Sequence, residues 1–270
     1  MDLRGATALV TGASSGIGRA TAEVLASAGV TVAISGRRAD ELQSLAERIT
    51  KRGSRVVVMP VDLAALGAAA ELGAHATRAL GHIDILINGA GAFESGSAAQ
   101  DDPTARALFE TNYWAPVALA GTLVPGMRAR GRGAIVNFSS IALVTPLPLM
   151  GSYPASKAAL ATVTEAMRIE LAGSGVHVVH AFLGGVNTPM HAKASRAYGR
   201  ALRWMPVGRP EAAARRILTA IRRHRPTVVY PRAVATIRWF PTIAAWISGH
   251  VVVPLLLGRG GSRSSATAQV

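Results

Sequence analysis

The sequence contains no cysteine, so disulfide bonds, thiolate nucleophiles and cysteine-ligated zinc sites are all excluded. Nothing therefore marks an oxidising compartment, and we expect a cytoplasmic protein. The seven histidines show neither an H-x-x-x-H nor an H-E-x-x-H spacing, so we also expect no bound metal. A secretory signal is not expected, because the apolar run at residues 6–10 already has the pattern of a buried strand leading into a glycine turn.

Acidic residues are almost missing from the last third of the chain. Residues 191–270 hold 14 basic side chains and a single acid, Glu211, whereas residues 1–190 are nearly balanced, with 15 basic and 14 acidic side chains. Such an asymmetry favours an anionic partner, which could be a membrane, a substrate or a polymer. A solvated basic face is the alternative. The segment has no groove-reading motif, so we expect no nucleic-acid partner.

The chain of 270 residues is 50% hydrophobic, which suits one domain with a substantial core. Short apolar runs alternate with amphipathic stretches along it. Strands are expected near residues 6–10, 31–35, 55–61, 83–88, 134–139, 177–182 and 227–230. Strand–helix alternation of this kind predicts a single Rossmann-type, doubly wound parallel sheet of about seven strands, with helices on both faces.

The strand–helix alternation stops near residue 231, and this divides the chain into two segments. Residues 1–231 form the expected Rossmann-type domain. Residues 232–270 form an apolar C-terminal extension flanked by basic residues, and its small-residue tail is expected to be disordered.

A glycine-rich stretch stands between the first expected strand and the first expected helix. Its sequence is Thr11-Gly12-Ala13-Ser14-Ser15-Gly16-Ile17-Gly18. The three glycines are spaced for a tight turn, a close approach to a pyrophosphate and close helix packing, with the anion at the helix N-terminus. Glycine clusters also mark ordinary turns, but the position directly after the first strand favours a dinucleotide site.

The second expected strand ends in Ser35-Gly36-Arg37-Arg38, where an NAD-binding fold would carry an acid for the ribose hydroxyls. No acid is present to repel a phosphate. Arg37, together with Arg38, could pair with the 2′-phosphate of NADP through its guanidinium fork. We therefore expect NADP(H) as the cofactor, against the alternative that both arginines are solvated residues at a helix start.

A tyrosine and a lysine are positioned for proton transfer. In Tyr153-Pro154-Ala155-Ser156-Lys157 the i,i+4 spacing places the phenol and the ammonium on one helix face. Ser139 and Ser140 close the preceding strand, at the end where a parallel sheet meets its ligand. A phenol has a pKa of about 10, so it needs a neighbouring cation to act near neutral pH.

Taken together, these residues resemble the short-chain dehydrogenase/reductase family from residue 5 to about residue 231. Ser140 lies thirteen residues before Tyr153, which is the usual interval in that family. The resemblance implies that Tyr153 is the general acid, Ser140 orients the carbonyl, Lys157 binds the nicotinamide ribose and lowers the tyrosine pKa, and Asn112 supports a proton relay. It also implies a dinucleotide held by Gly12, Ser14, Ser15, Gly16, Ile17, Gly18, Arg37, Arg38, Asp62, Leu63, Asn88, Gly89, Ala90, Tyr153, Lys157, Gly185, Val186 and Thr188.

Two positions depart from the family pattern. Gly89 replaces the second asparagine of Asn-Asn-Ala-Gly, and Gly184-Gly185 replaces the usual Pro-Gly after the sixth strand. Neither is a proton-transfer residue, so we expect altered rigidity, including a looser turn at Gly184, more than lost activity. A non-catalytic, NADP-binding regulator or scaffold remains the alternative to an enzyme, because a fold does not determine its function.

The resemblance implies a substrate loop within residues 188–208, and the large apolar side chains of this segment favour a hydrophobic ketone, aldehyde or lipid. These side chains are Met190, Tyr198, Leu202, Trp204 and Met205, and they could equally pack a lid helix.

The C-terminal extension carries 20 residues without a formal charge, from Trp239 to Gly258, with Arg238 and Arg259 on either side. We expect it either to lie on an anionic membrane surface or to cover a subunit interface or the substrate mouth, and a full membrane span is less expected because prolines interrupt it. The protein is expected to be a homo-oligomer, in the cytoplasm or peripheral on a membrane.

Overall fold

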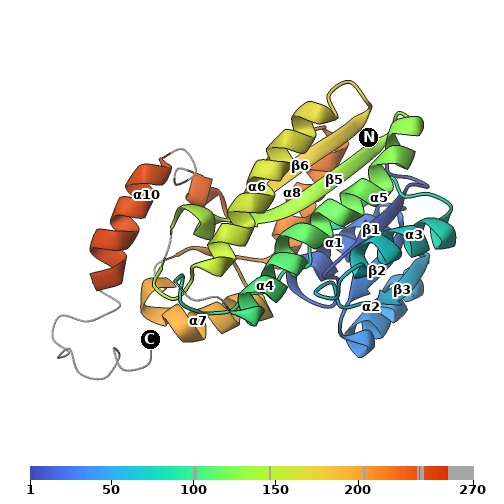
Figure 1. Cartoon of the computed structure of the whole chain (residues 1–270). Coiled ribbons are helices and arrows are strands. Elements are labelled where there is room, and N and C mark those ends of the chain that lie inside the picture. Colours follow the sequence, from blue (N-terminus) through green and yellow to red (C-terminus); the bar gives the residue numbers. More distant parts are fainter. Residues whose placement is uncertain (100–101, 146, 203–204, 236, 238–239, 255–270) are drawn as a thin grey trace.

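Seven parallel strands form the central sheet of this chain (Figure 1). The structure is a computed structural model, and it describes residues 1–99, 102–145, 147–202, 205–235, 237 and 240–254. Their order across the sheet is β3-β2-β1-β4-β5-β6-β9. The strands are β1 (Thr7–Val10), β2 (Thr31–Gly36), β3 (Val56–Pro60), β4 (Ile85–Asn88), β5 (Gly133–Ser140), β6 (Val176–Leu183) and β9 (Thr227–Tyr230). The expected fold class is confirmed, and each strand lies within two residues of its expected bounds.

The inner strands are mostly apolar because both faces of the sheet are covered. Every residue of β1 and of β4 is buried, as expected for strands of a parallel sheet between two helical layers. The strand order reverses between β1 and β4, where one chain connection leads toward β2 and the other toward β5. In doubly wound folds the ligand crevice lies at this point, beyond the carboxyl ends of the strands.

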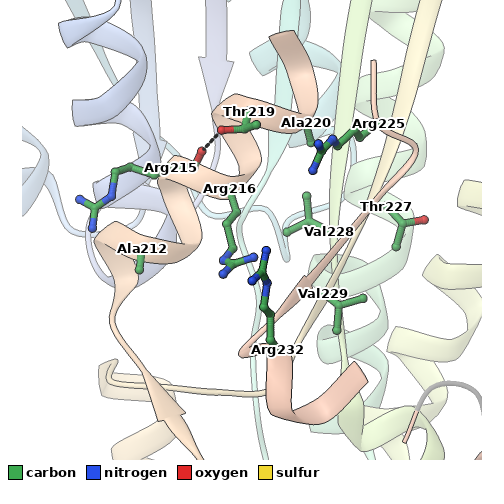
Figure 2. A pocket seen from close by; sticks show the side chains of 10 residues that line it. All are labelled: Ala212, Arg215, Arg216, Thr219, Ala220, Arg225, Thr227, Val228, Val229 and Arg232. Carbon is green, nitrogen blue, oxygen red and sulfur yellow. Dashed lines mark hydrogen bonds between the residues drawn. The ribbon is translucent and has the colours of Figure 1, made fainter. Parts of the chain in front are cut away.

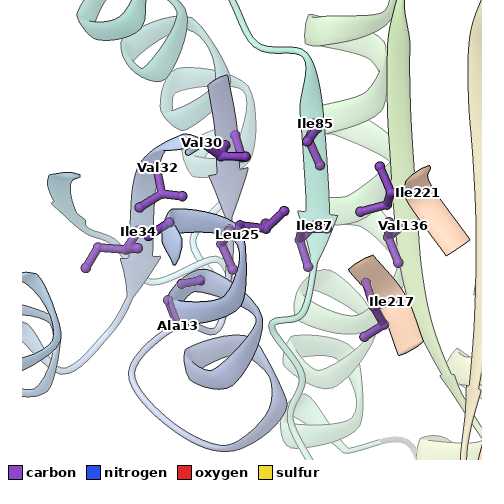
Figure 3. Packing of buried hydrophobic residues seen from close by; sticks show 14 of the residues in the cluster. Ala13, Leu25, Val30, Val32, Ile34, Ile85, Ile87, Val136, Ile217 and Ile221 are labelled. Atoms are coloured by element: carbon purple, nitrogen blue, oxygen red, sulfur yellow. The ribbon is translucent and has the colours of Figure 1, made fainter. Parts of the chain in front are cut away.

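Successive side chains of each strand point to opposite faces of the sheet, and a different set of helices packs on each face. Val10, Ile34 and Ile85 pack with α1 (Gly16–Ser27), α2 (Ala39–Lys51) and α8 (Pro210–Arg222), as Figure 3 shows for part of this cluster. Their neighbours Leu9, Ala33 and Leu86 point the other way, into a second cluster with α3 (Ala68–Leu80) and α5 (Ala115–Ala129). Helix α6 (Ser152–Glu170) borders this second cluster through Met167. The sheet is therefore doubly wound.

Two short strands form a feature that the sequence pattern did not predict. β7 (Gly185–Val186) pairs in parallel with β8 (Val207–Gly208), and the backbone N–H of Asn187 donates to the carbonyl of Gly208 at 2.9 Å. They close the two ends of the expected substrate segment, most of which forms α7 (Pro189–Leu202). The segment is thereby attached to the body at both ends.

The chain continues to pack against the body after β9. The 3-10 turn η3 (Arg232–Val234) buries Val234 against Ile141 and Phe182. Helix α10 (Pro241–Ile247) and the π-turn η4 (Ser248–Val252) follow, and α10 packs against η2 (Ile141–Val144), at the opposite end of the molecule from α2 and β3 (Figure 1). No helix among the described residues is both long enough and apolar enough to cross a bilayer. Residues 255–270 of the expected extension, and Trp239 within it, lie outside the described residues.

Candidate active site

The glycine-rich turn is held against the end of β4 by one hydroxyl group. Thr11 Oγ1 accepts hydrogen bonds from the backbone N–H groups of Gly89 and Ala90, both at 3.1 Å. Gly12 adopts a φ of +67°, and a Cβ there would lie 2.5 Å from the carbonyl oxygen of Gly89. A Cβ at Gly18 would lie 2.4 Å from the carbonyl oxygen of Gly12. Side chains are therefore excluded at these glycines, which leaves exposed backbone at the N-terminus of α1, the geometry that a pyrophosphate needs.

Arg38, rather than Arg37, is placed against this turn. Its Nη2 donates to Ser14 Oγ at 3.2 Å and to the carbonyl oxygen of Ser14 at 3.3 Å. Arg37 is exposed, and within the described part of the chain its side chain makes no hydrogen bond. A Cβ at Gly36 would lie 3.2 Å from Ser14 Oγ, so an acid at this position would also disturb the turn sterically.

Asp62 and Leu63, expected at the adenine side, have different surroundings. Asp62 is exposed, and its carboxylate accepts the N–H of Ala64 at 3.1 Å, which shapes the turn after β3. Leu63 is buried beside Leu9, Ala33 and Met59. Both residues follow the carboxyl end of β3, at the side of the crevice where Arg38 lies.

A chain of buried amides links the strands beneath the site. Asn88 Nδ2 donates to Asn137 Oδ1 at 2.8 Å, and Asn137 Nδ2 donates to Thr164 Oγ1 at 2.9 Å. Asn88 Oδ1 and Ser139 Oγ are buried without a partner among the described residues. Unpaired buried acceptors are costly, so these atoms fit a polar ligand such as a dinucleotide in the crevice. Sequence reasoning missed Asn137 and Thr164, for which a polar residue inside an apolar strand was the available signal.

Ser140 and Tyr153 are brought together where β5 meets α6. Ser140 Oγ accepts the N–H of Ala142 at 3.2 Å, capping η2, so its proton is available to donate. Tyr153 is half-buried in the first turn of α6. Desolvation by burial raises the pKa of the Tyr153 phenol, while a hydrogen-bonding interaction with the Ser140 side chain acts in the opposite direction.

Lys157 is buried one helical turn after Tyr153. Its side chain is directed inward, where Nζ donates to the carbonyl oxygen of Phe138 at 3.0 Å, and the residue is only 4% exposed. Burial lowers the pKa of the Lys157 ammonium group to about 8. A Cβ added at Gly91 would lie 3.6 Å from Lys157 Nζ and 3.5 Å from Asn112 Oδ1, so this glycine leaves open the space between the two groups.

Asn112 lies in a π-helical turn, η1 (Glu110–Trp114), between α4 (Pro103–Phe109) and α5. Such turns are rare and often mark functional positions. The Asn112 amide accepts the N–H of Ala92 at 2.8 Å and donates to the carbonyl of Ala92 at 3.0 Å. It also donates to Ser156 Oγ at 3.0 Å, and Ser156 in turn donates to the carbonyl of Tyr153 at 2.7 Å. Sequence reasoning missed Ser156, which ties Asn112 to the tyrosine backbone.

The tyrosine ring faces an apolar cluster formed by segments far apart in the chain. The Phe93 ring contacts the Tyr153 ring edge-on at a centroid distance of 5.3 Å, and it contacts the Tyr198 ring in the same way at 6.4 Å. The Tyr198 hydroxyl donates to the carbonyl of Leu149 at 2.9 Å, which attaches α7 to the loop before Tyr153. The remaining members are Met150, Ala142, Leu147, Met190, Ala194 and Leu202.

Three of the five expected substrate-side residues therefore belong to this cluster: Met190, Tyr198 and Leu202. Met205 instead packs with Ile141, Phe182 and Val234, and Trp204 lies outside the described residues. An ion pair between Lys193 and Glu94 also joins α7 to the loop after β4.

The turn after β6 closes the crevice from the other side. A Cβ at Gly16 would lie 2.8 Å from Thr188 Cγ2, so Thr188 is adjacent to the glycine-rich turn. Gly185 and Val186 lead to it as β7. Gly184 is held rather than loose: its N–H donates to the carbonyl of Tyr230 at 2.8 Å, a bond that a proline would remove. The departure at this position therefore adds a tie between β6 and β9.

The residues expected from four separate motifs thus gather at one edge of the sheet. In the described part of the chain, no group of three histidine or acidic side chains is arranged to hold a metal.

Comparison with known proteins identifies the family. A model of the short chain dehydrogenase family matches residues 6–199. The chain belongs to this family. A fatty acyl-CoA reductase of Mycobacterium tuberculosis is 34% identical over 253 residues, which are 92% of this chain and 84% of that protein. The chain spans 58% of the length of another curated relative that it matches, at 37% identity.

Solved structures of the family superpose on this short-chain dehydrogenase. L-sorbose reductase from Gluconobacter frateurii, complexed with NADPH and L-sorbose, is 29% identical with a TM-score of 0.77, covering 85% of this chain and 97% of that one. A short-chain dehydrogenase/reductase from Burkholderia phymatum in complex with NAD is 25% identical with a TM-score of 0.79, covering 88% of this chain and 93% of that one. The chain is an oxidoreductase of this family, and its structural neighbours include proteins with either dinucleotide.

Proposed function

We propose that this oxidoreductase interconverts a carbonyl and an alcohol on a hydrophobic substrate, with NADP(H) as the cofactor and Tyr153 as the proton donor and acceptor. The observation that carries the proposal is the buried Lys157 ammonium group, one helical turn from Tyr153 and open toward Asn112 across Gly91. A lysine this deep is held at a cost, which a functional role explains. Bound NADPH would supply a hydride to the carbonyl carbon.

The chain's own residues supply the proton and stabilise the charge. In the reductive direction negative charge develops on the carbonyl oxygen, where the hydroxyl groups of Tyr153 and Ser140 can both donate. Tyr153 then gives up its proton to this oxygen. A protonated Lys157 stabilises the resulting phenolate, whose formation burial opposes. Asn112, which holds Ala92 and Ser156 in place, keeps the floor of the site rigid.

A hydrophobic substrate is supported by the cluster that faces Tyr153. Phe93, Met150 and Tyr198 are all at most 6% exposed, and the other members of the cluster are apolar as well, apart from the hydroxyl of Tyr153. Aromatic and apolar walls with a small number of polar groups are typical of sites for apolar ligands. The likeness to fatty acyl-CoA reductases points in the same direction.

NADP(H) rather than NAD(H) is supported by Arg38 on Ser14 and by the missing acid at Gly36. The 2′-phosphate of NADP would lie at the end of β2. Arg38 provides a positive charge there, and no acidic side chain at Gly36 repels the phosphate.

A pair of matched tyrosine variants tests the proposed function. Tyr153→Phe deletes the transferable proton, and we expect turnover of NADPH with ketones and aldehydes to fall by more than about a thousandfold with little change in NADPH affinity. Tyr198→Phe, which packs in the same cluster, should retain most of the kcat. Activity of Tyr153→Phe within tenfold of wild type would reject the role, and wild type that binds NADPH but turns over none of a broad panel would favour the scaffold alternative.

We further propose that the C-terminal helix attaches this enzyme to an anionic membrane surface. Helix α10 and η4 have reversed amphipathicity, because the small residues Ala244 and Ser248 are buried while large apolar side chains face solvent. The exposed ones are Phe240, Ile243, Trp246, Ile247 and Val251, each 43–58% exposed. Aromatic and aliphatic side chains of this kind insert at the headgroup boundary of a bilayer. Since α10 packs on η2, directly after Ser140, the surface would deliver an apolar substrate beside the site.

Vesicle flotation tests this attachment. Wild type should float with vesicles of phosphatidylcholine and phosphatidylserine at low salt, and less as salt rises. Ile243→Glu with Trp246→Glu should abolish flotation. Leu66→Glu with Ile169→Glu makes the same charge change at exposed apolar residues elsewhere and should leave it intact. Wild type that stays in solution as an oligomer would favour a subunit interface at this helix instead. The expected homo-oligomer stays a prediction.

A further inference from the structure

An open hollow between α8 and the edge strand β9 is lined by four arginines. Arg215 and Arg216 come from α8, Arg225 from the turn that follows it, and Arg232 from η3. The hollow has a volume of about 420 Å³. None of its lining residues belongs to the catalytic or cofactor set. Figure 2 shows the guanidinium groups of Arg216 and Arg232 extending toward one another across it, while Arg215 points away at the rim.

No anionic side chain among the described residues neutralises these arginines. Within the described part of the chain, none of the four guanidinium groups makes an ion pair. The only acid in residues 191–270 is Glu211, which is exposed in the first turn of α8 and does not line the hollow. Facing guanidinium groups repel one another, and a bound anion would relieve that repulsion.

One of the arginines is held in place by the fold. The guanidinium carbon of Arg216 lies 5.5 Å from the centre of the Tyr230 ring, a cation–π arrangement. Tyr230 is itself buried, and its hydroxyl accepts the N–H of Arg209 at 2.8 Å. Arg216 is only partly exposed, so less of its side-chain entropy remains to be lost on binding. A solvated surface arginine lacks these restraints.

We propose that this hollow binds a phosphate group carried by a larger molecule, as a phosphomonoester or a diphosphate. Arginine forks match phosphate oxygens in pairs, and the two facing guanidinium groups of Arg216 and Arg232, with Arg225 also lining the hollow, exceed what a single carboxylate charge would require. The volume exceeds that of one phosphate, which leaves room for part of the molecule that carries it. A second copy of this chain is disfavoured here, because a two-fold contact would set arginine against arginine.

The carrier can be soluble or a lipid headgroup, and two probes separate these sources. Binding of pyrophosphate is measured by calorimetry on protein that holds one equivalent of NADPH, so that the cofactor crevice is filled without an excess of NADPH, itself a diphosphate, competing for the hollow. Binding to vesicles is measured with phosphatidylcholine that does or does not contain phosphatidic acid. A soluble carrier predicts binding of pyrophosphate, and a headgroup predicts binding only to the vesicles with phosphatidic acid.

Charge-matched variants decide whether the hollow is responsible. Arg216→Gln with Arg232→Gln should weaken binding of the responsive probe by about tenfold or more, because two charge-assisted contacts are lost. Arg222→Gln with Arg223→Gln removes the same charge from exposed positions outside the hollow and should change binding by less than about twofold. Arg225→Gln with Arg232→Gln alters only exposed side chains of the hollow. This second pair replaces the first one in the test if the Arg216 substitution destabilises the packing around Tyr230.

The proposal is overturned if the wild-type protein binds neither probe, or if the two charge-matched pairs of variants weaken binding equally. It is also overturned if vesicle binding is unchanged by the arginine substitutions in the hollow and is lost only in Ile243→Glu with Trp246→Glu. NADPH turnover should be the same in all arginine variants of this series. A failure at the hollow therefore leaves the proposed oxidoreductase function standing.

Discussion

The side-chain amide of Asn112 donates a hydrogen bond to the hydroxyl of Ser156, 3.0 Å away, and that hydroxyl donates to the backbone carbonyl of Tyr153. Both residues are fully buried. The bond joins the π-turn before α5 to the first turn of α6, so the proposed proton donor and the asparagine are positioned as one unit. Ser156 is enclosed by protein, with its hydroxyl bonded to Asn112 and to the Tyr153 backbone, and we regard it as a positioning residue.

Ser156→Ala should therefore lower kcat by about tenfold while changing NADPH affinity by less than about twofold. The variant leaves one N–H of the buried Asn112 amide unpaired, at a cost of about 1–3 kcal/mol in stability, and the asparagine shifts to regain a partner. Steady-state kinetics and urea denaturation measure both effects. Ser152→Ala, in the same turn but without a side-chain hydrogen bond among the described residues, is the control. An unchanged kcat in a destabilised Ser156→Ala would reduce Ser156 to a structural role.

The lowered pKa of Lys157 predicts how cofactor capture depends on pH. The proposed ribose contact needs the ammonium form, which exists below a pKa of about 8 and is lost above it. We expect kcat/KM for NADPH, which reports groups of the free enzyme, to be level below pH 8 and to fall by up to about tenfold per unit above it. The pKa of Tyr153 is raised, so its titration does not produce this decline.

Lys157→Arg provides the comparison for that pH profile. An arginine stays protonated throughout the range, so this variant should be slower but without the decline above pH 8. A level profile for wild type up to pH 10 would remove the ammonium requirement.

Arg38 and Arg37 allow a neighbouring-residue test of the cofactor preference. Arg38→Ala should raise the Kd for NADPH by about tenfold or more and leave the Kd for NADH nearly unchanged, since it loses a charge-assisted contact that only the 2′-phosphate makes. Arg37→Ala, at an exposed and unbonded side chain, should have the smaller effect. Fluorescence titration with both cofactors measures this. Equal affinity of wild type for NAD and NADP would contradict the assignment. Gly36→Asp is a poorer probe, because its side chain would also displace Ser14.

We expect replacement of Asp84 to lower the stability of the protein without changing its function. Its carboxylate is 5% exposed, accepts the N–H of Thr7 at 3.2 Å and is the nearest anion to His82, Arg130 and Arg132. Asp84→Asn should lower the free energy of unfolding by about 1–3 kcal/mol, because the buried amide keeps only one acceptor oxygen for these donors and the partly exposed Arg130 and Arg132 lose their counter-charge. Glu71→Gln, at an exposed acid, should change it by less than about 0.5 kcal/mol. Asp84 precedes β4 at the edge of the sheet opposite the site, so a changed KM would be unexpected.

Sequence reasoning predicted much of this molecule because its main signals are local. Seven apolar runs separated by helical patterns were sufficient for the doubly wound sheet. The spacing of Tyr153 and Lys157 was sufficient to place both on one helix face. What it missed were short elements and long-range contacts. The paired strands β7 and β8 are only two residues each, and Ser156, Asn137 and Thr164 have ordinary surroundings in the sequence. The order of importance of Arg37 and Arg38 was also undecided, since only one of two adjacent side chains can reach Ser14.

The sequence by itself determined the parallel sheet and the glycine-rich turn that is followed, at Gly36, by a position without an acid. It also supplied the residues that we propose for proton transfer. Periodicity, glycine spacing and residue chemistry are properties of short segments, and they persist whatever the rest of the chain does. Only the tertiary structure decided which groups meet: Thr11 with Gly89, Asn112 with Ser156, and Arg216 with Arg232 around an open hollow. The partners in each pair lie far apart in sequence, or on separate elements, and they meet because packing of the helices on the sheet brings them together.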